Sequence, residues 1–109
     1  MGQEIDIEFL KIICKNEDNI IITQHTLTRC NQRNISIDEI IQAIQNGEII
    51  EQYPDDYPNP SCLVLGITLK KRMLHVVCGT DNENLWIITV YVPNIANWEN
   101  DFKTRRKEQ

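Results

Sequence analysis

Four short runs of strand-forming residues fill the second half of the chain and constrain its fold more than any other feature. The runs, rich in Ile, Val, Leu, Tyr and Trp, cover residues 48–53, 62–69, 74–79 and 85–92. They have no helical period, and turn-like segments separate them, which is typical of β-strands. The connections 70–73 and 80–84 are short enough for hairpins, so consecutive strands are expected to pair antiparallel. The sequence therefore predicts a four-stranded antiparallel sheet.

The segment before these runs predicts a helix that begins at a capping box. Ser36 is placed to cap the helix, and Glu39 stands three residues later, where its carboxylate can reach back to the Ser36 backbone. Apolar residues then recur at intervals of three and four and define one inward face, made of Ile37, Ile40, Ile41 and Ile44. Gly47 follows where a left-handed residue can end the helix. This helix needs an apolar surface to pack on, and the sheet supplies one.

Two further helices and a short extended segment are expected nearer the N-terminus. Apolar residues at helical spacing predict an N-terminal helix within residues 3–15, and residues 24–32 predict a second helix capped by Thr23. Between them, three isoleucines at 20–22 are typical of a short strand or an extended arm. Helices first and strands afterwards predict an α+β domain of two layers, with the N-terminal helices packed on one face of the sheet. The other sheet face is expected to stay open.

The open face is the predicted functional face. Side chains alternate along a strand, so His75 is expected on the face opposite Leu74 and Val76. The same alternation in the run 85–92 separates two sets: Ile87, Thr89 and Tyr91 against Trp86, Ile88, Val90 and Val92. The side that carries His75, Thr89 and Tyr91 is the more polar one.

The composition fits a single domain of 109 residues, with 41% hydrophobic and 25% charged residues. A polar tail is expected at residues 99–109, starting as a short helix near Trp98. No stretch approaches the roughly 18 apolar residues of a membrane span, and the first residues lack the pattern of a signal peptide. A cytoplasmic location without a membrane partner is therefore expected. The four cysteines are expected to be reduced, although Cys62 and Cys78 lie where neighbouring strands could bring them face to face.

The formal net charge of −5 is unevenly distributed. Residues 36–60 hold six acidic side chains and no Lys or Arg, whereas residues 24–35 hold two arginines and no acid. The cationic segment provides local positive charge that could bind RNA despite the negative net charge, and the acidic segment could equally bind a basic protein partner. Within the acidic segment, Asp55 and Asp56 are expected to form a turn rather than a cation site.

His25, Arg29 and Arg33 recur every four residues, which places them on one face of the predicted helix. Arginine suits phosphate because its planar guanidinium donates two parallel hydrogen bonds, and histidine suits proton transfer near neutral pH. The alternative is a solvated helix face, or arginines that pair with the acidic segment. His75 likewise has an alternative, as a structural hydrogen-bonding residue within a strand.

A convergence of the two histidines and the arginines would permit RNA cleavage without a metal ion. One group takes the proton of the ribose 2′-hydroxyl, a second protonates the leaving oxygen, and arginine stabilises the charge on phosphorus. His25 and His75 are the acid and base candidates, and Tyr91 is a third candidate as proton donor or base-stacking residue. Arg29, Arg33 and Thr89 are the candidate substrate contacts. No cofactor is predicted, since the chain lacks a Gly-rich phosphate loop, a nucleophile elbow and an H-E-x-x-H motif.

A longer pattern resembles one known family. Its pieces are Thr23-x-His25-x3-Arg29-x3-Arg33-x-Ile35-Ser36, Gly47-x-Ile49-Ile50-Glu51-x-Tyr53-Pro54-Asp55-Asp56, Leu65-Gly66, Leu74-His75-Val76-Val77, and Ile88-Thr89-Val90-Tyr91-x-Pro93 with Trp98. Together they resemble domain of unknown function family 4258 over residues 20–98. The resemblance implies kinship with RelE-like and BrnT-like toxins of bacterial type II toxin–antitoxin systems, which are small α+β proteins that cleave RNA and are held inactive by a partner.

The resemblance also implies which residues matter. His25, Arg29, Arg33, His75 and Tyr91 match the polar positions of the family pattern. Asn34 stands where the pattern usually has Gly, a tolerable change because Asn adopts left-handed conformations. The leading hypothesis is a toxin-like endoribonuclease with RNA as substrate and an antitoxin protein as partner. The alternative is a non-catalytic module that binds a protein through the open sheet face or the acidic segment 36–60.

Overall fold

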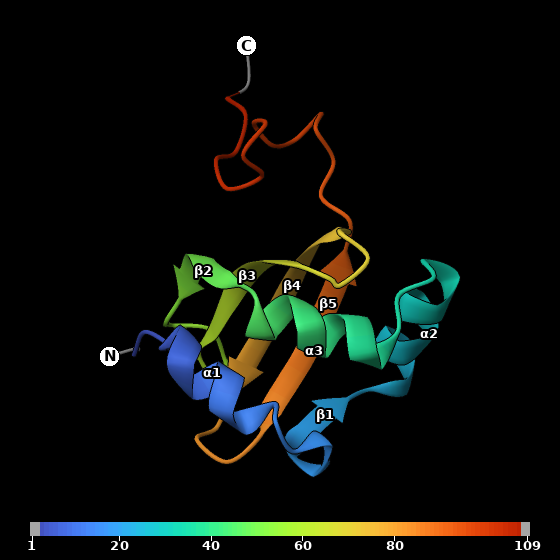
Figure 1. Ribbon diagram of the computed structural model, residues 1–109. Helices are drawn as coiled ribbons and strands as arrows, with labels where there is room; N and C mark the ends of the chain where they lie inside the picture. The colour runs from blue at the N-terminus through green and yellow to red at the C-terminus, as the bar shows by residue number, and fades with distance from the viewer. Residues whose placement is uncertain (1–2, 108–109) are drawn as a thin grey trace.

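The structure is a computed structural model, and it describes residues 3–107. Within this range, five strands form one mixed sheet in the order β1-β5-β4-β3-β2 (Figure 1). The strands are β1 (Ile20–Ile22), β2 (Glu48–Tyr53), β3 (Ser61–Ile67), β4 (Met73–Thr80) and β5 (Leu85–Tyr91). The helices are α1 (Ile7–Ile13), α2 (Gln24–Gln32) and α3 (Ile37–Gln45), with a 3-10 turn at Glu17–Asn19. None of the helices within residues 3–107 has the length and hydrophobicity that a membrane span requires.

The sheet confirms the four predicted strands as β2 to β5 and corrects their number. Neighbouring strands from β2 to β5 pair antiparallel. The fifth strand, β1, pairs parallel to β5, with Ile20 opposite Leu85 and Ile22 opposite Ile87. The prediction of a purely antiparallel four-stranded sheet is therefore wrong. Three isoleucines favour extended backbone but do not show which strand they will pair with. They pair with β5 because the backbone groups at its free edge need hydrogen-bond partners.

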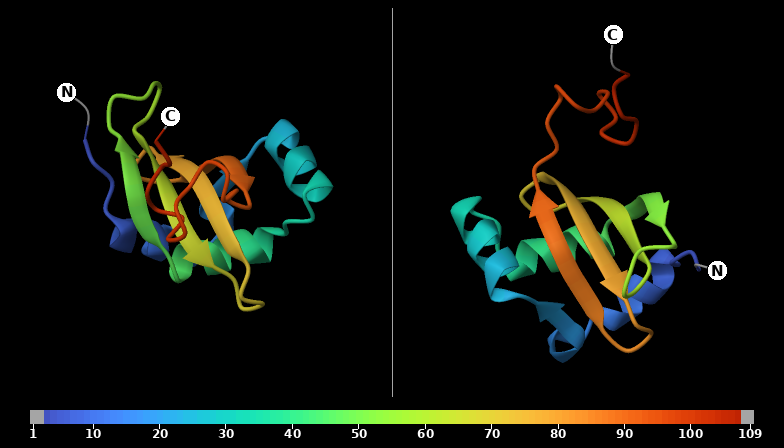
Figure 2. Two further views of the ribbon diagram at one scale, coloured as in Figure 1. Left: turned by 90° about the horizontal axis from the view of Figure 1, so that it is seen from above. Right: turned by 180° about the vertical axis from the view of Figure 1, so that it is seen from behind.

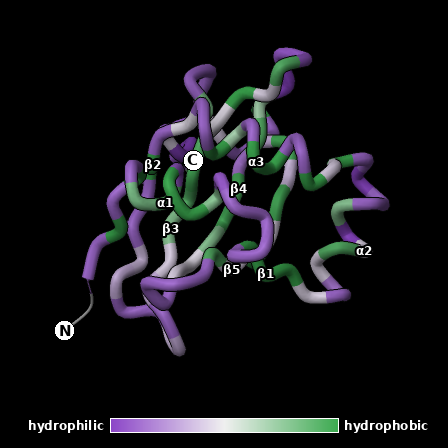
Figure 3. Tube along the Cα trace, turned by 60° about the horizontal axis from the view of Figure 1, so that its bottom comes forward, coloured by the Kyte–Doolittle hydropathy of each residue, from purple (hydrophilic) through white to green (hydrophobic). Residues whose placement is uncertain are grey.

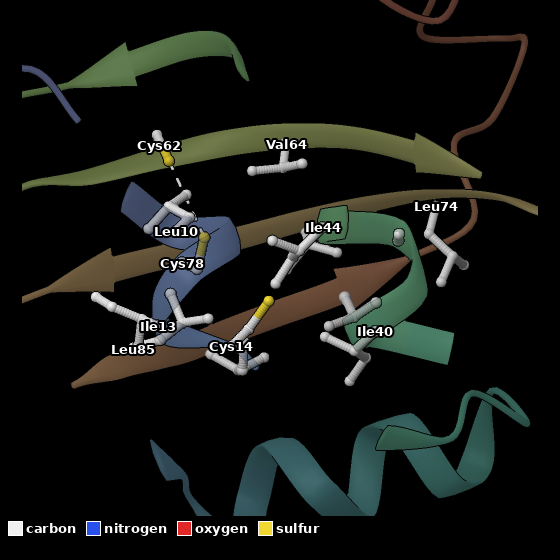
Figure 4. Packing of buried hydrophobic residues seen from close by; sticks show 14 of the residues in the cluster. Leu10, Ile13, Cys14, Ile40, Ile44, Cys62, Val64, Leu74, Cys78 and Leu85 are labelled. Atoms are coloured by element: carbon white, nitrogen blue, oxygen red, sulfur yellow. Dashed lines mark hydrogen bonds between the residues drawn. The ribbon is translucent and has the colours of Figure 1, made fainter. Parts of the chain in front are cut away.

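One face of the sheet carries α1 and α3 and holds the main hydrophobic core (Figure 4). From α3, Ile40, Ala43 and Ile44 are buried, while Ile37 and Ile41 of the predicted apolar stripe are half-buried. The capping box forms as predicted, with Ser36 Oγ accepting from the Glu39 amide at 3.1 Å. The helix therefore begins at the residue that the sequence indicates.

Helix α2 departs from the predicted layer and lies beside β5, as the views from above and behind show (Figure 2). Its side chains bond to the strand edge. Thr26 Oγ1 donates to the Ile88 carbonyl at 3.0 Å, and Arg33 Nη1 donates to the Val90 carbonyl at 2.7 Å. The expectation that all the N-terminal helices pack on one face is corrected, because the mostly polar α2 (Figure 3) has little apolar surface to bury there.

The turn between α2 and α3 confirms the expected conformation of Asn34, whose φ is 58°. The Ile35 amide donates to the Cys30 carbonyl at 2.8 Å, which closes the C-terminus of α2 in a Schellman arrangement. Arg72, from the turn before β4, donates to the Arg33 and Asn34 carbonyls and pairs with Glu39. The angle between α2 and α3 is therefore fixed by the backbone turn at Asn34 and by the Arg72 side chain.

A β-bulge at Ile88 overturns the simple alternation predicted for β5. Thr89 pairs with Val77, but Ile87 pairs with Cys78, so β5 has one extra residue between these pairs. Ile87 consequently faces the core together with Val90, and not the side of Thr89 and Tyr91 as predicted. Both periodicities fit the sequence equally well, and only the pairing with β4 distinguishes them.

The sheet face opposite α1 and α3 is not fully open, which corrects a second expectation. Residues 93–106, here called the C-terminal segment, cover the end of this face near His75 with irregular chain instead of the predicted short helix. Trp98 is 3% exposed and packs edge-on against His75, with ring centroids 4.5 Å apart. Ion pairs from Lys103 to Glu48 and from Arg105 to Glu51 hold the segment on β2.

Two glycines mark where α3 approaches the sheet most closely. A Cβ on Gly66 would lie 1.8 Å from the Ala43 carbonyl oxygen, and a Cβ on Gly47 would lie 2.4 Å from the same atom. Gly47 does not adopt the left-handed conformation predicted for it, since no glycine in the described range has a positive φ. Gly66 is required because α3 lies directly on the backbone of β3. Gly47 is required because a Cβ there would meet the last turn of α3 and would also lie 2.9 Å from the Leu65 carbonyl oxygen.

We expect Gly66→Ala to destabilise the protein by about 3 kcal/mol or more, since the new methyl group meets a backbone atom that cannot rotate away. The measurement is the free energy of unfolding in urea. The exposed variant Lys70→Ala serves as the control and should change it by less than about 0.5 kcal/mol. Equal stability of Gly66→Ala and wild type would contradict the close approach of α3 to β3.

Candidate functional site

A shallow groove between α2 and β5 collects most of the predicted site residues. Its volume is about 160 Å³, and its lining consists of His25, Thr26, Arg29, Arg33, Ile88 and Thr89. The three cationic or imidazole side chains are all exposed. Four of the six predicted site residues, His25, Arg29, Arg33 and Thr89, therefore meet at one place.

The groove is built by helix α2 and by the bulge in β5. Thr23 caps α2 by accepting from the Thr26 amide, so His25 falls in the first turn and Arg29 and Arg33 follow on the same face. Thr26 and Arg33 bond to the Ile88 and Val90 carbonyls, which aligns the helix along the strand. The bulge turns Thr89 away from the core and toward the sheet face beside α2. These contacts fix the backbone positions from which His25, Arg29, Arg33 and Thr89 project into the groove.

The positive charge of Arg29 and Arg33 is not neutralised by an ion pair in the described part of the chain. Throughout residues 3–107, no carboxylate lies within ion-pair distance of Arg29 or Arg33. Three glutamates of the acidic segment 36–60 pair elsewhere: Glu39 with Arg72, Glu48 with Lys103 and Glu51 with Arg105. The alternative in which the acidic segment neutralises these two arginines is therefore not what the structure shows. An anion that enters the groove meets positive charge and hydrogen-bond donors.

His75 and Tyr91 form a separate pair outside this groove. The His75 ring is fully buried, and its Nε2 lies 2.8 Å from the Phe102 carbonyl oxygen. Because a carbonyl only accepts, Nε2 carries the proton and Nδ1 accepts from the Tyr91 hydroxyl at 3.1 Å. The predicted convergence of the two histidines in one pocket does not occur among the groove residues. The structural alternative for His75 agrees with these contacts.

Burial sets the protonation of this pair. Desolvation lowers the pKa of His75 below its ordinary value, although the Phe102 carbonyl and the Glu51 carboxylate act in the opposite direction. Burial likewise raises the pKa of the Tyr91 hydroxyl. The native state therefore favours a neutral imidazole that bonds the C-terminal segment to the sheet.

A clamp around Glu51 completes the attachment of the C-terminal segment. Arg105 donates two hydrogen bonds to the Glu51 carboxylate, from Nε at 2.8 Å and from Nη2 at 2.9 Å. The Tyr53 hydroxyl donates a short hydrogen bond to the same carboxylate. These contacts lower the pKa of Glu51, and burial together with that carboxylate raises the pKa of Tyr53 to about 12. The guanidinium also lies over the Trp98 ring, 4.7 Å from its centroid.

Sequence reasoning missed this clamp and the role of the C-terminal segment. One signal was available, because Trp98 is a large apolar residue within a polar stretch and such residues need cover. The partners of Trp98 are His75 of β4 and Arg105 of the C-terminal segment, and spacing in the sequence could not show that they meet. The turn expected at Asp55 and Asp56 is present, and the Asp56 amide donates to the Tyr53 carbonyl at 3.2 Å. All four cysteines are free, and the Cys62 and Cys78 sulfurs lie 4.0 Å apart (Figure 4). Among residues 3–107, no cluster of three or more His, Cys, Asp or Glu side chains is placed to hold a metal ion.

Comparison with known proteins assigns the family. Residues 22–92 match the family described as Domain of unknown function (DUF4258), which covers well over half of the chain, so the protein belongs to that family. Neither the curated proteins nor the solved structures offer a match. All six residues that line the groove lie within the matched range, whereas α1 and the C-terminal segment lie outside it.

We expect the free energy of unfolding to fall as the pH drops through about 6.5, the ordinary pKa of histidine. Below that value the unfolded chain binds a proton that the buried His75 resists, so protons favour the unfolded state. The measurement is urea unfolding at pH 7.5 and 5.5. The variant His75→Gln should be less stable at pH 7.5 but should lose less stability on acidification than wild type.

The matched control is His25→Ala, which removes the exposed histidine and should keep the pH dependence of wild type. An unchanged slope in His75→Gln, or a slope abolished in His25→Ala, would show that His75 is not the group responsible.

Proposed function

We propose that this member of family DUF4258 is a toxin-like endoribonuclease that cleaves RNA in the groove between α2 and β5 without a metal ion. The observation that carries the proposal is the set of exposed His25, Arg29 and Arg33 side chains in one groove with no paired carboxylate within the described range. A phosphodiester is the anion that such a combination suits. Guanidinium groups bind phosphate oxygens in a fork, and an imidazole beside them moves protons near neutral pH.

The proposed reaction uses the RNA's own 2′-hydroxyl as nucleophile. The His25 imidazole accepts the hydroxyl proton, the 2′-oxygen bonds to phosphorus, and the bond from phosphorus to the 5′-oxygen breaks. The leaving oxygen takes up a proton from solvent, so the products are a 2′,3′-cyclic phosphate and a 5′-hydroxyl. Arg29 and Arg33 stabilise the additional negative charge on phosphorus, and the Thr89 hydroxyl donates to a phosphate oxygen.

In this proposal His75 and Tyr91 have a different role from the one that the sequence suggested. Their hydrogen bonds support the C-terminal segment. His75 is fully buried and Tyr91 is half-buried, and neither lines the α2 groove. The proposal includes kinship of the family with RelE-like and BrnT-like toxins, an antitoxin protein as the inhibiting partner, and a cytoplasmic site of action where RNA is available.

The alternative of a non-catalytic protein-binding module has less support. The C-terminal segment covers the His75 end of the sheet face, and three of the acidic side chains in residues 36–60 are engaged within the protein. The α2 groove, in contrast, presents its charges to solvent.

We expect purified protein to cleave RNA and His25→Ala to reduce the rate by about 100-fold or more, the usual contribution of a general acid or base. Arg29→Ala should reduce it about 10- to 100-fold, since the Arg29 side chain makes no hydrogen bond or ion pair within residues 3–107 that the substitution would remove, and its proposed role is to bind the phosphate. The measurement is the rate of appearance of 2′,3′-cyclic phosphate ends, with EDTA present throughout.

Lys70→Ala is the matched control because it removes one positive charge from an exposed turn outside the groove. It should cleave RNA at the wild-type rate. RNA left intact by the wild-type protein, or cleaved equally by wild type and His25→Ala, would refute the proposed activity.

A further inference from the structure

An exposed tryptophan lies on the sheet face beside the groove and has no role in the fold comparable to that of Trp98. Trp86 is 36% exposed, whereas Trp98 is 3% exposed. Trp86 pairs with Gly79, and its neighbours Leu85 and Ile87 face the core, so its indole stands on the face opposite α1 and α3. The C-terminal segment covers the other end of this face, near His75 and Tyr91. The indole therefore presents aromatic surface to solvent.

The position of Trp86 relative to the groove follows from the contacts of β5. The strand runs from Trp86 through the bulge at Ile88 to Thr89, a distance of about 10 Å at the usual rise per residue. Helix α2 is aligned so that its first turn, with His25, bonds near Ile88 and its last residues bond near Val90. Trp86 consequently lies beyond the His25 end of the groove, on the same strand.

The indole is held in place and its polar edge is occupied. Trp86 Nε1 donates to the Asp81 carboxylate at 3.3 Å, which orients the ring from the turn before β5. Beside it, Ile21 of β1 pairs with Trp86 in register and shares its face. An oriented aromatic ring flanked by an aliphatic side chain is a surface on which a planar group can stack. The Asp81 charge repels phosphate, so a bound strand keeps its backbone on the side of α2.

We propose that Trp86 is a nucleobase-stacking subsite, and that the substrate of the groove is therefore single-stranded RNA with an unstacked base next to the phosphate bound by Arg29 and Arg33. This inference rests on the proposed function and adds the substrate class. Stacking on an aromatic side chain is available only to bases that have left their own stack, which single strands permit and duplexes resist. Arg29 and Arg33, which have no ion pair within the described range, can bind the negatively charged backbone of a single strand. The aromatic ring on the adjoining strand can stack with one of its bases.

The test is the binding of three uncleavable 2′-O-methyl oligonucleotides to the full chain. They are a single-stranded hexamer of uridine, the same backbone without bases, and a duplex of the same length. The single strand should bind more tightly than the other two and should quench the fluorescence of Trp86. Trp86→Ala should weaken binding of the single strand about 5- to 100-fold, the range seen when a stacked aromatic residue is removed. Its affinity for the abasic strand should stay that of wild type.

Two further variants keep the result interpretable. Trp86→Phe retains a ring and should recover most of the affinity that Trp86→Ala loses. Leu69→Ala removes an exposed apolar side chain distant from the groove lining and should bind like wild type. Equal affinity of wild type and Trp86→Ala for the single strand, or of wild type for the single and abasic strands, overturns the stacking subsite and leaves the phosphate groove intact. No binding of any oligonucleotide overturns the proposed function as well.

Discussion

The candidate site depends on how the free edge of β5 satisfies its backbone. Strand β1 pairs with only three residues of β5, and β5 continues to Tyr91 without β1 beside it. Backbone carbonyl groups at a strand edge need partners. Thr26 of α2 bonds to the Ile88 carbonyl, and Arg33, the residue that ends α2, bonds to the Val90 carbonyl. These two hydrogen bonds tie a largely polar helix to the sheet without a large apolar interface. They also determine that His25 and Arg29, on the same helix, stand over Thr89.

The bulge at Ile88 lets one strand serve two surfaces. Without it, the alternation along β5 would send Ile87 and Thr89 to the same side, and either the core would lose an isoleucine or the groove would lose its hydroxyl. The extra residue keeps Ile87 and Val90 in the core and leaves Thr89 on the outer face. Bulges increase local twist and redirect side chains, and they are frequent beside functional sites. Here the redirected residues are those that meet α2.

Local signals in the sequence predicted local structure well. The capping box at Ser36 placed the start of α3, and the bounds of α2 and β2 agree with the structure, because each depends on neighbours in the chain. The pairing of β1, the bulge and the covered sheet face could not be predicted, since each depends on contacts between distant segments. His75 shows the difference: a histidine among apolar strand residues fits an open face as well as a buried one, and the decision comes from Trp98 and Phe102, more than 20 residues later.

The cationic groove is compatible with a net charge of −5 because the charges nearest the groove act on it more strongly than the sum over the chain. Lys11, Arg72, Lys103, Arg105 and Arg106 each pair with a carboxylate. A charge that is paired in this way produces little electric field at a distance. Arg29 and Arg33 have no carboxylate partner within residues 3–107, so their field is not cancelled. At physiological ionic strength exposed charges are screened beyond about 8 Å. A phosphate within the groove therefore responds to the side chains of α2 more than to the charge of the whole chain, and the sign of the local charge governs what binds there.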